Sequence, residues 1–195
     1  MALIDSAHHS IDYNKFARLS RQLRPGMVWV SSGATEIGRL DYMQRNGAEL
    51  NGDADEVKMD YAAQGQAILM QTYRNFIDAR YSVRQVLVEH GHFNDPAKRE
   101  NIRQMLLRAP AQNAVPIVNY NDAVSCEENR KMEIRQLQRE RGAAVELVDN
   151  DETAAQIACL VRAKTLLIFS TLSGIYSDVH NPATLIREIS APTVA

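Results

Sequence analysis

The sequence contains little cysteine. Only Cys126 and Cys159 occur among the 195 residues, and they form neither a CxxC pair nor a zinc-type spacing. Two cysteines cannot build a disulfide framework, so this composition indicates a reducing, cytoplasmic compartment.

Long hydrophobic runs are missing as well. No stretch approaches the roughly 18 apolar residues that a membrane-spanning helix needs. The first residues, MALIDSAHHSIDYNKF, also lack the apolar core of a signal peptide. We therefore expect no membrane partner.

Charge of one sign is not concentrated anywhere in the chain. The 22 Lys and Arg residues are interspersed with 24 Asp and Glu residues, which leaves a net charge of -2. Binding to a phosphate backbone usually needs a clustered basic surface, so we expect no nucleic-acid partner. Apolar residues make up 45% and charged residues 24%, which is typical of a folded globular protein. We expect one domain over residues 1–195.

Short apolar runs alternate with longer amphipathic stretches, which is the pattern of βα units that build a largely parallel sheet covered by helices. The sequence thus predicts an α/β fold. The expected strands are residues 27–30, 83–88, 114–119, 143–148 and 165–170. The expected helices are residues 11–23, 54–79, 95–109, 127–142 and 152–163. The highly charged helix 127–142 is predicted to be a solvated outer helix.

Polar residues follow three of the predicted strands, as Ser31–Ala34, Asn119–Asp122 and Asp149–Asp151. In open α/β sheets, ligands gather beyond the carboxyl ends of the strands, so these three segments are predicted to surround one pocket. A Ser-Gly loop before a helix offers backbone N–H groups that suit a carboxylate or a phosphate. Serine and glycine also cap ordinary helices, and Asn-Asp clusters also close ordinary turns.

The His90-Gly91-His92 segment could direct two imidazoles the same way from a strand end and bind a metal ion. Histidine pairs of this kind are more often structural, and we predict no metal site.

Five blocks of sequence, in order, resemble successive blocks of the glutamate 5-kinases, a group within the amino-acid-kinase family. The blocks are VSSGATEIG at 30–38, YAAQGQ at 61–66, VPIVNYNDAV at 115–124, VDNDETAAQIACLV at 148–161 and GIYSD at 174–178. The resemblance covers about residues 10 to 182, and VPIVNYNDAV and DND are its most specific parts.

The resemblance implies a three-layer αβα sandwich with a mainly parallel sheet. It implies a phosphotransferase that moves the γ-phosphoryl group of ATP, with Mg²⁺, to the side-chain carboxylate of glutamate in proline biosynthesis. Residues that match the family's substrate positions are Ser32, Gly33, Ala34, Asp122 and Asn150. Asp151 matches the acidic residue that organises the catalytic lysines. The corresponding nucleotide-binding residues are Ser170, Thr171, Gly174 and Tyr176.

The chain departs from the family's pattern in its lysines. The family has a Lys-x-Gly-Ser loop before the first matched block and a second catalytic lysine after the last one. None of the five lysines of this chain stands at a matching position: Lys15, Lys58, Lys98, Lys131 and Lys164. We therefore expect an incomplete domain, truncated at both ends. Without the family's opening strand the sheet would expose unpaired backbone, so we also expect a homo-oligomer.

Three functions stay open from the sequence. The first is phosphorylation of glutamate or a similar acidic amino acid. The second is a kinase of the same fold that acts on a nucleoside monophosphate, as uridylate-kinase-like enzymes do. The third is a non-catalytic binding or oligomerisation protein that retains the substrate pocket.

Overall fold

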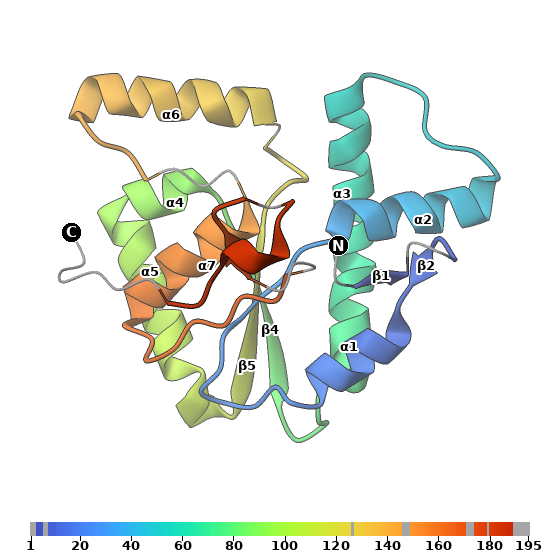
Figure 1. The fold of residues 1–195 in the computed structure, drawn as a ribbon, viewed down its shortest axis with the longest axis horizontal. Coiled ribbons are helices and arrows are strands. Elements are labelled where there is room, and N and C mark those ends of the chain that lie inside the picture. Colours follow the sequence, from blue (N-terminus) through green and yellow to red (C-terminus); the bar gives the residue numbers. More distant parts are fainter. Residues whose placement is uncertain are drawn as a thin grey trace.

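A computed structural model describes residues 3–5, 8–125, 127–145, 149–170, 174–178 and 180–188 (Figure 1). Its α-helices are α1 (Tyr13–Ser20), α2 (Ala34–Asn46), α3 (Ala54–Phe76), α4 (His90–Asn94), α5 (Pro96–Arg108), α6 (Glu127–Arg141) and α7 (Asn150–Val161). Its strands are β1 (Ile4–Asp5), β2 (Ser10–Ile11), β3 (Trp29–Val30), β4 (Ser82–Val88), β5 (Ala114–Tyr120), β6 (Ile175–Tyr176) and β7 (Leu185–Ile186). Two 3₁₀ turns span Pro110–Gln112 and Pro182–Thr184.

The main sheet is parallel and has the strand order β3-β5-β4. Strand β5 lies in the middle, where Trp29 pairs with Ile117 on one side and Ser82 pairs with Ala114 on the other. All seven residues of β5 are buried. The continuous apolar run that predicts this strand is typical of parallel sheets covered on both faces.

Helices cover both faces of the sheet, with α1, α2 and α3 on one side and α4, α5 and α7 on the other (Figure 1). Side chains alternate along β5, so Val115 and Ile117 pack in the first core while Val118 and Tyr120 pack in the second. The predicted αβα layered fold is confirmed.

Aspartate side chains cap the N-termini of four helices. Asp12 accepts a hydrogen bond from one backbone N–H in the first turn of α1, and Asp53, Asp95 and Asp149 each accept from two in the first turns of α3, α5 and α7. Such caps satisfy donors that have no partner within the helix. They fix the starts of these helices close to where the sequence predicts them.

The predicted strand at residues 165–170 is wrong. This segment joins no sheet, and Leu167 and Phe169 are 72% and 59% exposed. The ring of Phe169 lies 5.8 Å from the ring of Trp29 in β3, so the segment passes near the edge of the sheet. Only two residues of β3 take part in pairing, so this edge offers little backbone for another strand.

The predicted strand at residues 143–148 is also not formed in its described part, residues 143–145; residues 146–148 lie outside the described residues. Asn94 provides the reason. Its side-chain amide donates to the Val145 carbonyl at 2.9 Å and its Oδ1 accepts from the Val145 N–H at 2.8 Å. A side chain from α4 thus replaces the hydrogen bonds that a neighbouring strand would supply.

Two short antiparallel pairs, β1-β2 and β6-β7, lie outside the main sheet. The segment GIYSD contributes β6, in which Ile175 pairs with Ile186. None of the helices in the described ranges is long and apolar enough to cross a membrane.

Helices α2 and α3 cross at two glycines. A Cβ atom on Gly65 would overlap the carbonyl oxygen of Ala34, and one on Gly38 would overlap the carbonyl oxygen of Tyr61. Both contacts involve backbone atoms, which cannot rotate away as a side chain can. The crossing therefore fixes the first turn of α2 against α3.

The Gly65→Ala variant should lower the free energy of unfolding by about 3 kcal/mol, because the added methyl group must push the two helix backbones apart. Urea denaturation followed by circular dichroism measures this change. The matched control is Gly91→Ala in α4, where a Cβ meets no atom within 4 Å. Equal stabilities of the two variants would contradict the proposed tight crossing.

Candidate functional site

A pocket of about 280 Å³ lies beyond the carboxyl ends of the parallel strands. It receives residues from α2, α3, the segment after β5, α6 and the start of α7. Its lining consists of Thr35, Asp55, Lys58, Met59, Tyr120, Asp122, Ser125, Arg130, Asp149 and Asn150. Two of the three predicted segments therefore contribute to this cavity, through Asp122, Asp149 and Asn150, while Thr35 directly follows the third segment.

The segment after β5 is held by hydrogen bonds to the neighbouring strand. The backbone N–H of Asn121 donates to the carbonyl of Val88 at 2.9 Å, and its side-chain amide donates to Glu89 at 2.7 Å. The chain then turns, with the Val124 N–H donating to the Asn121 carbonyl. This turn places Asp122 in the pocket wall.

Arg130 enters the pocket from α6 and is the nearest described cation to Asp122. Its Nη2 lies 3.7 Å from Oδ1 of Asp122, and its guanidinium carbon lies 4.2 Å from the centre of the Tyr120 ring. The Arg130 side chain is only 6% exposed. Burial raises the pKa of Asp122, while the charge of Arg130 opposes that rise. The carboxylate therefore favours a positively charged neighbour.

The start of α7 contributes Asp149 and Asn150. Asp149 caps the helix by accepting from the backbone N–H groups of Asp151 and Glu152. Oδ1 of Asn150 is buried and accepts no hydrogen bond from the described residues. An unpartnered buried acceptor is costly, so this atom is suited to accept a hydrogen bond from a ligand.

The predicted substrate loop lies beside this pocket. Gly33 has a φ of 102° and precedes α2, whose first N–H groups receive no side-chain cap. Such a helix start favours an anion. Ser32 is exposed, Ala34 lines a much smaller cavity next to the main one, and Thr35 lines the main pocket.

The structure thus brings Asp122 and Asn150 into one cavity, with the predicted loop at its border. Asp151 lies in the first turn of α7, where it is exposed and lines no described pocket. The roles assigned to these residues remain predictions.

The predicted nucleotide-binding residues lie elsewhere. Ser170 is exposed at the end of the extended segment, Gly174 precedes β6 and Tyr176 belongs to β6. None of these three lines the described pockets, and Thr171 lies outside the described residues. Their role in nucleotide binding also remains a prediction.

Two cations of the pocket, Lys58 and Arg130, were not predicted as site residues. Lys58 lies in the second turn of α3, and no sequence motif around it indicates a site. Arg130 belongs to the helix that was expected to be solvated, but Arg130 and Ile134 are both buried. The apolar residues Ile134 and Leu137 could have indicated the inner face of α6. Arg130 lies on that same face, one helical turn before Ile134.

The two histidines expected at a strand end lie instead in α4, and they contact different groups. Nε2 of His90 lies 3.1 Å from a Glu133 oxygen in α6, while its Nδ1 lies 3.5 Å from the Tyr120 hydroxyl. Nδ1 of His92 accepts from the backbone N–H of Glu89. Within the described ranges, no cluster of three or more His, Cys, Asp or Glu side chains is arranged to hold a metal ion.

Comparison with known proteins decides the family. The sequence profile of the amino acid kinase family matches residues 3–195. This chain belongs to the amino acid kinase family. The predicted resemblance is therefore confirmed.

Within that family, the chain is similar to curated glutamate 5-kinases. It is 35% identical to the protein of Symbiobacterium thermophilum over 158 residues, which cover 79% of this chain and 52% of the relative. It is 35% identical to the protein of Herpetosiphon aurantiacus over 184 residues, covering 90% of this chain and 44% of the relative. The glutamate 5-kinase of Streptococcus suis is 28% identical over 179 residues. The chain spans about half the length of these relatives.

The environment of His90 predicts how the stability of this amino acid kinase chain depends on pH. Burial lowers the pKa of His90 below its ordinary value of 6.5. Below pH 6.5 the unfolded chain takes up a proton that the folded chain still excludes. The free energy of unfolding should therefore fall as the pH drops from 6.5 toward the lowered pKa.

Urea denaturation between pH 7.5 and 5 should show this decline in the native chain and a shallower decline in the His90→Gln variant. Subtracting the two curves removes the contribution of other titrating groups. Parallel curves would show that His90 is not protected from protonation.

Proposed function

We propose that this chain forms the acceptor-binding part of an ATP-dependent kinase that phosphorylates the side-chain carboxylate of L-glutamate. The observation that carries the proposal is the pocket in which Asp122 and Asn150 meet Lys58 and Arg130. Membership of the amino acid kinase family and the similarity to glutamate 5-kinases support it. A cytoplasmic location, a role in proline biosynthesis and a homo-oligomeric state remain predictions.

The pocket has the charges that a zwitterionic, acidic ligand requires. Asp122 and the buried Oδ1 of Asn150 both suit a donor such as an ammonium group. Lys58 and Arg130 lie on different walls, α3 and α6, and both suit carboxylates. L-Glutamate has one ammonium and two carboxylate groups, which matches this arrangement.

Phosphoryl transfer to a carboxylate brings two anions together, so the protein must neutralise charge and fix geometry. Lys58 and the backbone N–H groups at the uncapped start of α2 can donate hydrogen bonds to anionic oxygens at the border of the pocket. ATP would supply the transferred phosphoryl group. Mg²⁺ would accompany the ATP and help to neutralise its phosphates, since kinases commonly bind this ion through one or two carboxylates together with substrate phosphates.

The two other readings make different demands on the same pocket. A nucleoside monophosphate carries no ammonium group. It would therefore leave Asp122 and the buried Oδ1 of Asn150 without the donor that an amino acid offers, which makes that reading less favourable than glutamate. A non-catalytic protein would bind glutamate equally well but would not use ATP.

Isothermal titration with L-glutamate tests the proposal directly. The native chain should bind glutamate, and Asp122→Asn should weaken binding by about tenfold or more, because the ammonium group loses its charged partner. The control is Asp60→Asn, which removes an exposed carboxylate from α3 without touching the pocket.

A second assay measures ADP release from Mg-ATP in the presence of glutamate. Glutamate-dependent ADP release would support the kinase, whereas glutamate binding without ADP release would support the non-catalytic reading. Absence of glutamate binding to the native chain would contradict the proposed function.

A further inference from the structure

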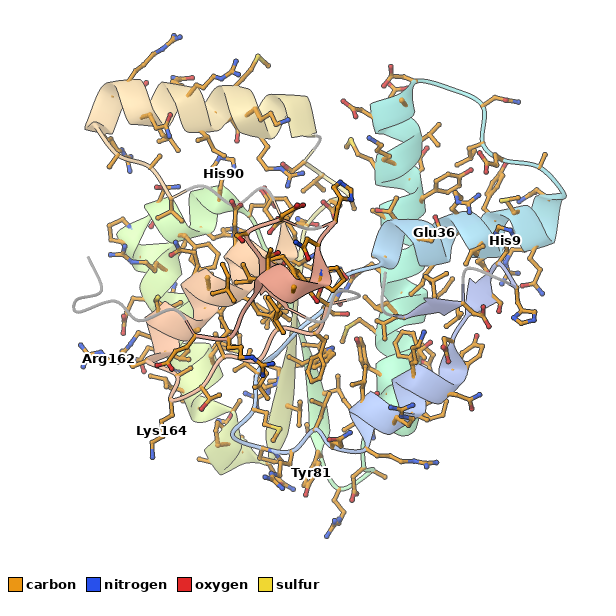
Figure 2. All side chains as sticks on the ribbon, in the orientation of Figure 1. His9, Glu36, Tyr81, His90, Arg162 and Lys164 are labelled. Carbon is orange, nitrogen blue, oxygen red and sulfur yellow. The ribbon has the colours of Figure 1, made fainter. Side chains whose placement is uncertain are left out.

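Helix α6 is held over the pocket by contacts with the body of the fold. Figure 2 shows His90 beneath this helix, and Nε2 of His90 lies 3.1 Å from a carboxylate oxygen of Glu133. At the far end of the helix, Arg141 donates to the Asn94 carbonyl at 3.1 Å. Ile134 is buried between these contacts. The helix therefore has a defined inner face, and Arg130 is the charged residue that this face directs to the pocket wall.

The guanidinium of Arg130 lies over an aromatic ring. Its carbon lies 4.2 Å from the centre of the Tyr120 ring, and Tyr120 is the last residue of the fully buried strand β5. Stacking on an aromatic ring restricts the plane of a guanidinium group. A planar group in a set orientation suits the two oxygens of a carboxylate better than a flexible ammonium would.

The groups next to Arg130 indicate which of the two substrate carboxylates, the α-carboxylate or the side-chain carboxylate, Arg130 would bind. Asp122 lies 3.7 Å away, and Asn150 presents an unpartnered buried acceptor in the same cavity. In an α-amino acid the ammonium group and the α-carboxylate are attached to the same carbon. An acidic subsite directly beside a cationic subsite therefore matches that end of the molecule. The side-chain carboxylate is then left to Lys58 and the start of α2.

We propose that Arg130 determines specificity by binding the α-carboxylate of the amino-acid substrate. This inference rests on the proposed function, since it assigns one part of the same ligand to a residue. It also gives α6 a role beyond that of a charged outer helix. If Arg130 served only to attach α6 to Tyr120, its loss would affect all ligands alike.

The test compares two ligands by isothermal titration. L-Glutamate carries the α-carboxylate, whereas 4-aminobutyrate lacks it and keeps the other two charged groups. The native chain should prefer glutamate by about tenfold or more. The Arg130→Gln variant should bind glutamate about tenfold more weakly and bind 4-aminobutyrate nearly unchanged, so the preference disappears.

Two further variants separate this role from a structural one. Arg130→Lys keeps the charge but loses the planar fork, so it should retain part of the preference. Arg135→Gln removes an exposed arginine from the same helix and should behave like the native chain. Thermal denaturation checks that each variant is folded. If Arg130→Gln fails to fold, a reduced preference in Arg130→Lys carries the test.

The outcomes distinguish this inference from the proposed function. A preference for glutamate that persists in both Arg130 variants would overturn the inference, as would equal weakening of both ligands, and neither would affect the proposed function. If the native chain binds no glutamate, the proposed function fails and the inference fails with it.

Discussion

The complete burial of β5 is the constraint on which the site depends. This strand pairs with β3 on one side and β4 on the other, and helices cover both of its faces. A strand enclosed in this way cannot shift its register without moving every side chain to the wrong face. The strand therefore ends at a fixed position, at Tyr120. The turn that follows places Asp122 in the pocket wall. The position of the site follows from the packing of the sheet.

The glycine crossing between α2 and α3 fixes the opposite wall. Gly38 and Gly65 let the two backbones approach closely, which sets the start of α2 against the body of α3. Thr35 and Lys58 line the pocket from these two helices. Contacts within the core thus determine the separation of charged groups that would bind a ligand. Small changes in the core would be expected to alter binding without touching the pocket.

Much of this architecture could be predicted from the sequence because the signals were local. The apolar run 114–119 identified β5, and the predicted helix starts lie close to the aspartates that cap four helices in the structure. Position after predicted strands identified the segments 119–122 and 149–151, and the family resemblance then singled out Asp122 and Asn150 within them. These signals work because a buried parallel strand and a capped helix each depend mainly on their own residues.

The errors came from features that depend on distant partners. Residues 165–170 have the composition of a strand, but the short β3 gives them little to pair with. Val145 is held by the side chain of Asn94, which no pattern near Val145 indicates. Arg130 was missed because charge suggested solvent, whereas its contacts with Tyr120 and Asp122 lie on other elements.

A crystal structure of the chain grown with L-glutamate would test the central claim most directly. The account predicts one glutamate in the pocket, with its ammonium group within hydrogen-bonding distance of Asp122 and Asn150. Its two carboxylates should lie toward Arg130 and toward Lys58. Glutamate bound elsewhere, or bound with its ammonium group away from Asp122, would contradict the account.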